Sequence, residues 1–257
     1  MKHSIRRLKY GIRRELAARL LLSIAALWPA LSPAQPGAQP GINTPYLVHP
    51  DVARWNRAFT REDREVYAKR DEILAAAAVQ PGMSVADIGA GTGLFTMMFA
   101  EAVKPGGRVY AIDISQAFID YIRQTAQARK RTNITAIVGD GIEVPLPEAS
   151  VDLIFMSDVY HHFEHPGQTL ASIRKALRPG GRMVVVDYER IPGVTPPQRI
   201  EHVRLDKQTT IKEIGSAGFR FVGEKKLMRQ NYFLVFQRPQ DIAAPPAQEI
   251  AAPPTRE

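Results

Sequence analysis

The sequence predicts an α/β fold in which a doubly wound, mostly parallel sheet of seven strands ends in an antiparallel hairpin. Short apolar runs alternate with helical stretches between residues 84 and 187, which is typical of βαβ units with helices on both faces of a sheet. Only a few residues separate the last two runs, so these are expected to form a hairpin. The predicted strands are Ser84–Ile88, Arg108–Ile112, Ile134–Val138, Val151–Met156, Arg182–Asp187, Phe219–Lys226 and Tyr232–Gln237.

The N-terminal segment, residues 1–34, has the order of a cleavable export signal. A basic stretch precedes an apolar run from Leu20 to Leu31, and Ser32-Pro33-Ala34 follows as a cleavage site. The run is shorter than the roughly 20 residues that a helix needs to span a bilayer, so no stable membrane span is expected after cleavage. The sequence thus predicts a periplasmic or secreted protein, with a cytoplasmic location as the alternative if the segment does not act as a signal.

The remaining chain divides into three predicted parts. Residues 35–50 are rich in proline and glycine and predict a linker, with a possible ordered strap at Tyr46 and Leu47. Residues 51–238 form the predicted domain, which begins with a helical cap of one or two amphipathic helices over 51–80. Residues 239–257 contain IAAPP twice and predict a disordered tail.

The formal net charge of +8 is concentrated in the signal segment. Seven of the 34 basic residues lie in residues 1–34 against Glu15 alone, which leaves 27 basic and 25 acidic residues elsewhere. The rest of the chain is nearly neutral, so a phosphate-neutralising surface for nucleic acid is not expected. The chain has no cysteine, which excludes disulfides, a thiolate nucleophile and cysteine-bound metal sites.

A glycine-rich turn follows the first predicted strand in VADIGAGTG, residues 85–93. Glycines let the backbone turn tightly and approach a ligand, and the next helix begins with free N–H groups. Asp113 ends the following strand, where a carboxylate can accept from both ribose hydroxyls. A dinucleotide loop reads Gly-x-Gly-x-x-Gly, whereas this turn reads Gly-x-Gly-x-Gly after Asp87. The difference favours a ligand with ammonium and carboxylate groups over a pyrophosphate.

Five segments in order resemble the motifs of the class I S-adenosylmethionine-dependent methyltransferases, in particular the branch that acts on small molecules. The match runs from about Pro81 to Gln237 and implies the seven-stranded fold of that family and S-adenosylmethionine as cofactor. The five segments are DIGAGTG (87–93), AIDIS (111–115), VGDGIEVPLPEAS (138–150), VDLIFMSDVYHHF (151–163) and LRPGGRMVVVD (177–187).

The resemblance implies a cofactor role for several residues. The glycine turn would line the methionine part, Asp87 would support its ammonium group, and Asp113 would hold the ribose. Ile114 would pack on the adenine ring, with Asp140 accepting from the adenine amino group. The alternative for the three aspartates is a structural one, as helix caps. The implied cofactor residues are Asp87, Gly89, Gly91, Gly93, Asp113, Ile114, Asp140, Gly141 and Ser157.

The acceptor pocket is expected where the fourth strand ends, because ligands of such sheets bind outside the carboxyl ends of the strands. Asp158, Tyr160, His161 and His162 are the candidate catalytic residues, with a histidine as general base or as a structural support of its loop. No metal site is expected from His161, His162 and His165, because the side chains of adjacent residues diverge in direction.

The sequence predicts an enzyme that methylates a small molecule by in-line displacement, since no large insertion is present to recognise a macromolecule. Two alternatives remain at this point: an exported S-adenosylmethionine-binding protein without turnover, and a nicotinamide-dependent oxidoreductase. The acceptor, its reacting atom and the oligomeric state are not determined by the sequence.

Overall fold

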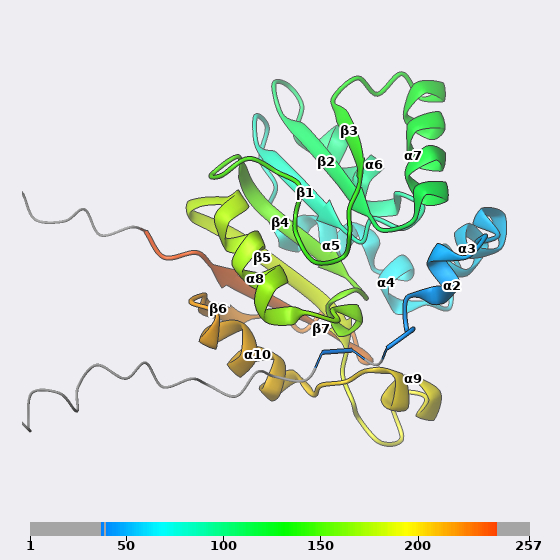
Figure 1. Ribbon diagram of the computed structural model, residues 1–257, viewed down its shortest axis with the longest axis vertical. Coiled ribbons are helices and arrows are strands. Elements are labelled where there is room, and N and C mark those ends of the chain that lie inside the picture. Colours follow the sequence, from blue (N-terminus) through cyan, green and yellow to red (C-terminus); the bar gives the residue numbers. More distant parts are fainter. Residues whose placement is uncertain (1–36, 39, 241–257) are drawn as a thin grey trace, which may run out of the picture. The chain divides into compact units, whose positions relative to one another are not determined.

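A computed structural model describes residues 37–38 and 40–240 of the protein, arranged around one seven-stranded sheet (Figure 1). The predicted signal segment and nearly all of the predicted tail lie outside these residues. The strands are β1 (Ser84–Ile88), β2 (Arg108–Asp113), β3 (Ile134–Val138), β4 (Val151–Ser157), β5 (Leu177–Tyr188), β6 (Arg220–Glu224) and β7 (Asn231–Gln237), in the spatial order β3-β2-β1-β4-β5-β7-β6.

Every strand except β7 runs in the same direction, which confirms the predicted fold class. β7 pairs antiparallel with β5 from Arg182↔Gln237 to Tyr188↔Asn231, and β6 pairs antiparallel with β7 at the edge of the sheet. The loop between β6 and β7 is too short for a crossover, so the chain must reverse direction there. The antiparallel hairpin predicted from the close spacing of the last two apolar runs is therefore present.

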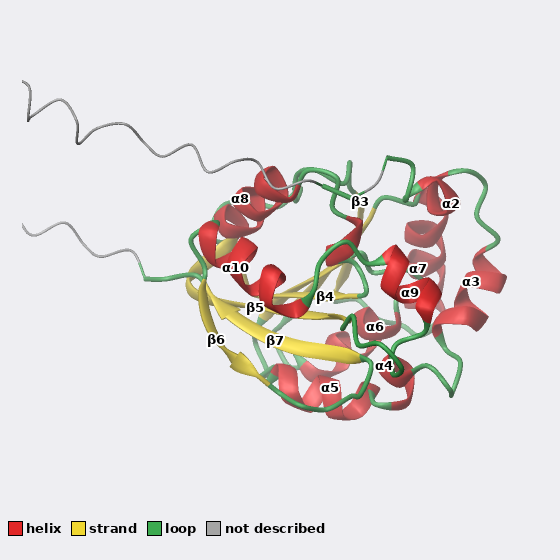
Figure 2. Cartoon of the chain, turned by 90° about the horizontal axis from the view of Figure 1, so that it is seen from below, coloured by secondary structure: helices red, strands yellow, loops and turns green. Residues whose placement is uncertain are grey.

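Helices cover both faces of the sheet (Figure 2). α5 (Arg70–Ala77), α6 (Leu94–Ala102) and α7 (Gln116–Ala128) lie on one face, and α8 (Pro166–Ala176) and α10 (Lys207–Ser216) lie on the other. Successive side chains of a strand point to opposite faces, so Phe155 of β4 packs with the first group and Ile154 with the second. Both side chains are fully buried, as expected for a central parallel strand.

The helical cap consists of α2 (Thr44–Leu47), α3 (Val52–Phe59) and α4 (Glu65–Ala68). α2 lies inside the segment predicted as a linker, because the ring of Tyr46 packs 4.8 Å from that of Trp55 and orders the chain. The predicted helical region 51–80 contains three helices, α3 to α5, rather than one or two. The Glu65 carboxylate accepts from the backbone N–H groups of Arg229 (2.9 Å) and Gln230 (2.7 Å), which holds the cap to the start of β7.

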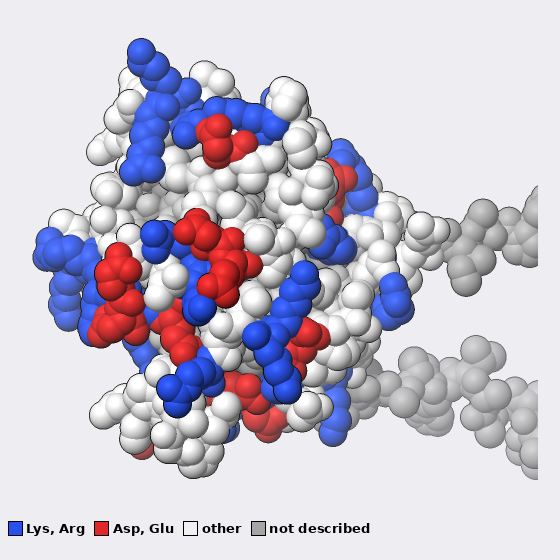
Figure 3. Space-filling model, turned by 180° about the vertical axis from the view of Figure 1, so that it is seen from behind, with Lys and Arg blue, Asp and Glu red and all other residues white. Residues whose placement is uncertain are grey.

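Basic and acidic side chains are interspersed on the surface. On the face drawn in Figure 3, Lys and Arg lie next to Asp and Glu. Lys104, for example, pairs with Glu101 at 3.0 Å on α6, and Arg123 pairs with Asp120 at 2.9 Å on α7. Among the helices of the described residues, none is long and apolar enough to traverse a lipid bilayer.

We expect Phe155→Ala to lower the free energy of unfolding by about 3–5 kcal/mol, because it leaves a cavity in the most tightly packed face of the sheet. The Phe155 ring lies 4.7 Å from that of Phe95 and 5.0 Å from that of Phe99. Chemical unfolding followed by circular dichroism measures the loss. Phe221→Ala is the matched control, since Phe221 is 38% exposed on β6 and should lose much less. Equal losses would contradict this account of the core.

Candidate active site

A cavity of about 220 Å³ opens at the carboxyl ends of β1, β2 and β4. The glycine turn after β1 and the ends of β2 and β4 form one side of it. The cap, the 3₁₀ turn η1 (Tyr160–His162), the end of β5 and α9 (Pro197–His202) form the other. The cavity therefore joins the predicted cofactor residues to the predicted acceptor residues.

The glycine turn has a backbone that side chains would disrupt. Gly89, Gly91 and Gly93 have φ angles of 66°, 54° and 86°, a region that favours glycine. A Cβ on Gly89 would lie 2.3 Å from Val159 Cγ2, and one on Gly91 would lie 3.1 Å from the Phe59 ring. These two glycines line the cavity. Gly93 instead packs against α7, where a Cβ would lie 2.9 Å from Ile122 Cγ1.

Asp113, the last residue of β2, holds the glycine turn in place. Its carboxylate accepts from the backbone N–H of Gly91 at 2.8 Å and from that of Ser115 at 2.9 Å. Burial raises the pKa of Asp113 to about 6, although these backbone donors act in the opposite direction. Asp113 and the following Ile114 both line the cavity, as predicted for the nucleoside side of the site.

Asp87 lies below the turn at the end of β1 and also lines the cavity. The Thr96 hydroxyl of α6 donates to its carboxylate at 2.6 Å. Burial raises the pKa of Asp87 to about 7, and the Thr96 hydrogen bond partly offsets that rise. Asp87 is therefore protonated over much of the acidic range unless a cation lies beside it.

The loop after β3 places Asp140 differently from the sequence interpretation. Its Oδ1 accepts from the backbone N–H groups of Ile142 and Glu143, both at 2.8 Å, and these bonds lower the pKa of the carboxyl. Asp140 is not part of the cavity lining, whereas Gly139, Gly141 and Glu143 are. The carboxylate caps a turn and not the helix considered as the alternative, because an Asp side chain readily bonds backbone donors two and three residues ahead.

The end of β4 carries Ser157 and Asp158. The buried Ser157 hydroxyl has no hydrogen-bond partner among the described residues and lines the cavity. Asp158 has a left-handed backbone (φ 54°) and accepts from Arg64 of the cap at 2.7 Å and from Asn231 of β7 at 2.8 Å. Burial raises its pKa, and the Arg64 charge opposes the rise. Asp158 thus joins the cap, β4 and β7.

Tyr160 was predicted to be catalytic, but the structure directs it away from the cavity. Its hydroxyl donates to Glu213 of α10, which also pairs with Arg204, and its ring is buried. Burial and the Glu213 charge raise the pKa of Tyr160. Successive residues of a 3₁₀ turn point about 120° apart, so Tyr160 and the two following histidines cannot all face one pocket.

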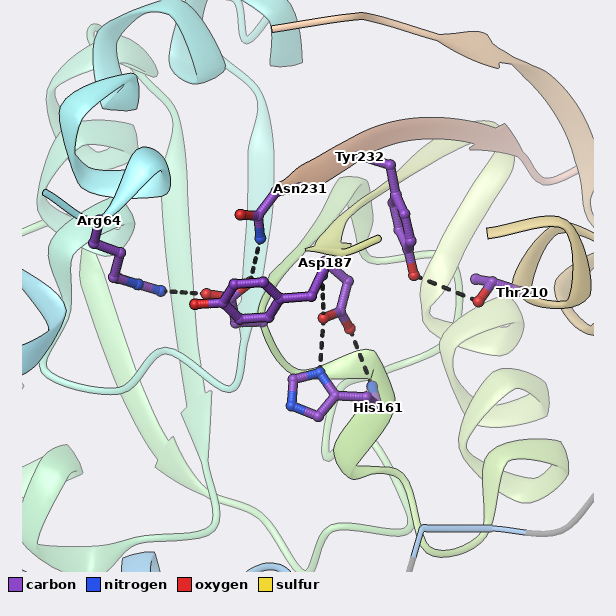
Figure 4. Close-up of polar contacts among 8 residues, drawn as sticks. Arg64, His161, Asp187, Thr210, Asn231 and Tyr232 are labelled. Carbon is purple, nitrogen blue, oxygen red and sulfur yellow. Dashed lines mark hydrogen bonds and ion pairs between the residues drawn. The ribbon is translucent and has the colours of Figure 1, made fainter. Parts of the chain in front are cut away.

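His161 is fixed by a buried carboxylate. Its Nδ1 lies 2.7 Å from Asp187 Oδ1, and its backbone N–H donates to Asp187 Oδ2 at 3.1 Å (Figure 4). This contact favours the tautomer in which Nδ1 donates to the carboxylate and Nε2 faces away from it. Asp187 ends β5 and was not predicted as a site residue. It could have been found as the final residue of the LRPGGRMVVVD motif, at the carboxyl end of a central strand.

His162 stacks on His161, with ring centroids 4.2 Å apart, and meets the edge of Tyr46 at 5.4 Å. Its Nδ1 is buried and has no hydrogen-bond partner among the described residues. Burial, followed by the neighbouring imidazoles and Arg199, lowers the pKa of His162 to about 2. The ring is therefore a neutral imidazole.

His202, the last residue of α9, completes a group that sequence spacing did not reveal. Its ring lies 5.0 Å from that of His161 and 5.2 Å from that of His162, although about 40 residues separate them in the chain. We call His161, His162 and His202 the histidine cluster. His165, which sequence reasoning considered beside the first two, is exposed and outside the cavity lining.

Aromatic side chains close the cavity. The rings of Trp55 and Phe59 on α3 lie 5.4 Å apart over the glycine turn, and Phe59 meets Phe118 of α7 at 6.1 Å. Beside the histidine cluster, the Arg199 guanidinium lies 5.1 Å from the centre of the Tyr188 ring. The cavity thus has a glycine and aspartate side and an aromatic and imidazole side.

Comparison with known proteins agrees with this geometry. The model of a family described as methyltransferase domain matches residues 86–185, which contain all of β2 to β4 and most of β1 and β5. The ubiquinone/menaquinone biosynthesis C-methyltransferase UbiE of Burkholderia orbicola is 30% identical over 118 residues. That region is 46% of this chain and 48% of the relative, so the chain spans about half the length of this curated relative.

Solved structures share the fold. A SAM-dependent methyltransferase from Aquifex aeolicus superposes with a TM-score of 0.67 at 20% identity, over 73% of this chain and 98% of that chain. The [4+2]-cyclase SpnF has a TM-score of 0.58 at 15% identity, over 68% and 83% of the respective chains. Residues 86–185 are thus similar to a methyltransferase domain, and the solved structures share the fold of the whole sheet.

Proposed function

We propose that the protein transfers the methyl group of S-adenosylmethionine to a small-molecule acceptor by in-line displacement. The observation that carries this proposal is the continuous cavity in which the glycine turn and Asp113 face the aromatic and imidazole side. A donor and an acceptor that lie on opposite sides of one cavity can be aligned and shielded from water. Alignment and exclusion of water are the main requirements of a methyl transfer.

The residues of the glycine turn fit S-adenosylmethionine. Gly89 and Gly91 line the cavity and carry no side chain, so the methionine part can lie against the backbone. Asp113 Oδ1 and Oδ2 each accept one backbone hydrogen bond and keep further lone pairs for ribose hydroxyls. Asp87 is placed to pair with the ammonium group, and Ile114 and Gly141 border the adenine.

The acceptor is expected against the aromatic and imidazole side. When bound, the cofactor supplies a methyl group on a positively charged sulfur, and a lone pair of the acceptor displaces that sulfur. Asp187 orients the His161 ring so that Nε2 keeps a lone pair for this half of the cavity. Tyr188 and Arg199 provide an aromatic surface and a positive charge, which suit a planar acceptor that carries an acidic group.

The two alternatives differ from this proposal in what they bind and turn over. A binding protein would hold the donor and transfer nothing. A nicotinamide oxidoreductase would need a pyrophosphate-binding loop, whereas the family match favours S-adenosylmethionine. The fold alone does not decide the reaction, since the similar structure of SpnF belongs to a protein described as a cyclase.

We expect the protein to transfer radioactive methyl from S-adenosylmethionine into the low-molecular-weight fraction of a cell extract. Asp113→Ala should weaken binding of the donor and of S-adenosylhomocysteine at least tenfold and reduce transfer, because it removes the ribose acceptor and releases the Gly91 N–H. Titration calorimetry and scintillation counting measure the two effects.

The control for this experiment is Asp120→Asn, which changes an aspartate that is half exposed on α7 and should leave both measurements unchanged. Donor binding without label transfer would support the binding protein. Label incorporated into macromolecules would contradict the small-molecule acceptor, and binding of NADH in place of the donor would contradict the methyltransferase itself.

We expect donor binding to release a proton at pH 6.5. The pKa of Asp87 is about 7 in the free protein, and an adjacent ammonium group favours the ionised form. The affinity should therefore fall as the pH drops below 7, approaching about tenfold per pH unit. Calorimetry in two buffers of different ionisation enthalpy counts the protons. Asp87→Asn keeps an acceptor for Thr96 and should abolish the release; an unchanged release would exclude Asp87 as its source.

We also propose that residues 1–34 direct the protein out of the cytoplasm. The proposal rests on the basic stretch, the apolar run from Leu20 to Leu31 and Ser32-Pro33-Ala34. A tag placed after Glu257 is expected to appear on a shortened protein in the periplasmic or secreted fraction. Full-length protein confined to the cytoplasm would disprove export and leave the proposed reaction unaffected.

A further inference from the structure

We propose that the histidine cluster binds one divalent transition-metal ion, with Zn²⁺ as the best chemical match, and that this ion holds an oxygen of the acceptor. The metal site itself concerns residues of this chain alone. The role of the ion in holding the acceptor rests on the proposed methyl transfer. It specifies the acceptor as a molecule with an acidic hydroxyl, such as a phenol or an enol.

The three imidazoles are already gathered at one point. Each offers one ring nitrogen, and these nitrogens lie within 4.8 Å of one another. Zinc binds imidazole nitrogen at about 2.0–2.1 Å in a tetrahedral arrangement, which places the nitrogens of a loaded site roughly 3.4 Å apart. Small rotations of the His202 side chain, at the end of a six-residue helix, would close the remaining distance.

Asp187 prepares His161 as a ligand. Metal-bound histidines usually donate their other ring N–H to a carboxylate or carbonyl, which fixes the tautomer and the direction of the ring. The contact of 2.7 Å between His161 Nδ1 and Asp187 Oδ1 has this form. Asp187 also accepts from the backbone N–H of His161 and of Tyr188, so the carboxylate itself cannot turn.

His162 supplies the second, independent observation. Buried polar atoms nearly always have a partner, and each exception needs an explanation. His162 Nδ1 is buried without a hydrogen-bond partner among the described residues, while its ring faces His161 and His202. A coordinate bond to a metal ion would satisfy the His162 imidazole, which a water-excluding stack of three rings otherwise leaves unpaired.

The three nitrogen ligands determine which class of metal ion fits the cluster. Three imidazoles without a carboxylate ligand suit zinc and its neighbours in the first transition series, whereas Mg²⁺ and Ca²⁺ prefer oxygen ligands. Three protein ligands also leave a coordination position open, which is typical of catalytic rather than structural zinc. Two of the three ligands, His161 and His162, line the cavity together with Tyr188 and Arg199, so an acceptor in the cavity can reach the ion. Arg199 is exposed, so solvent screens its repulsion of the ion.

The open position explains how the acceptor is activated. A hydroxyl oxygen bound to the ion loses its proton to solvent more readily, because the cation stabilises the oxygen anion. A lone pair of that oxygen then forms the new bond to the methyl carbon. The bond from this carbon to sulfur breaks, and its electron pair stays on sulfur. The products are the methyl ether of the acceptor, S-adenosylhomocysteine and one proton.

The test uses the full chain, purified with a tag that contains no histidine and freed of metal with a chelator. Calorimetric titration with ZnCl₂ is expected to show one ion per chain, and CoCl₂ should produce the visible absorption of four-coordinate cobalt. His202→Ala should weaken zinc binding at least tenfold. Asp187→Asn should weaken it about 10- to 100-fold while all three ligands remain.

His165→Ala is the matched control, since it removes an exposed histidine only three residues from His162. Circular dichroism establishes that each variant is folded, and the rise in melting temperature on adding zinc gives a second measure of binding. Absence of zinc binding by the wild type, or binding that His202→Ala leaves unchanged, would overturn the site.

Donor binding and methyl transfer by the metal-free protein separate the metal inference from the proposed function. If the metal-free chain binds S-adenosylmethionine and transfers methyl normally, the inference that the ion holds the acceptor fails and the proposed function stands. If zinc binds at the cluster and no methyl transfer occurs, the metal site stands and the proposed function fails. Methyl transfer that chelation abolishes and zinc restores supports both.

Discussion

Four aspartates meet at one edge of the sheet because β1, β2, β4 and β5 are parallel and aligned in register. Ile88 lies opposite both Ile112 and Met156, and Met156 lies opposite Val185, so the four strands end at nearly the same level. Within two residues of that level the chain places the carboxylates of the site. They are Asp87, Asp113, Asp158 and Asp187.

Asp87, Asp113 and Asp187 are buried and Asp158 is partly buried, and each carboxylate has a different partner. Thr96 donates to Asp87, backbone N–H groups donate to Asp113, Arg64 pairs with Asp158, and His161 contacts Asp187. They also repel one another: the charge of Asp113 raises the pKa of Asp87, and that of Asp187 raises the pKa of Asp158. An edge with this excess of negative charge suits a donor whose sulfonium and ammonium groups are positive.

The strands and the glycine turn were predictable because they depend on local pattern. Apolar runs mark buried strands, and no residue other than glycine fits at Gly89 and Gly91. Long-range contacts decide the rest. The strap expected at Tyr46 and Leu47 is part of α2, because Tyr46 meets Trp55. Tyr160 was expected in the pocket but turns to Glu213, because a 3₁₀ turn separates its direction from that of His161. His202 lies beside His161 because the chain comes back to the cavity at α9. No residue spacing in the sequence indicates this contact.

One side of the cavity bears on the identity of the methyl donor, and the other bears on the identity of the acceptor. The glycine turn and Asp113 belong to the sheet that many proteins of the fold share, so they indicate the donor. The acceptor depends on α2, η1 and α9, which are short elements held by side-chain contacts such as that of Tyr46 with His162. For this reason comparison with other proteins shows the fold, whereas the proposed acceptor has to be inferred from the chemistry of the imidazole side.

The contacts that hold the cap also determine when it can form during synthesis. Glu65 accepts from Gln230, which follows it by 165 residues, and Arg64 meets Asp158 and, through it, Asn231. These bonds cannot exist until the chain has been made almost to the end of the domain. Glu65 therefore lacks these partners until nearly the whole domain has been translated, and the cap cannot be completed earlier. In an exported protein, as proposed from residues 1–34, such a delay keeps the start of the domain in the unfolded form that a translocation channel accepts.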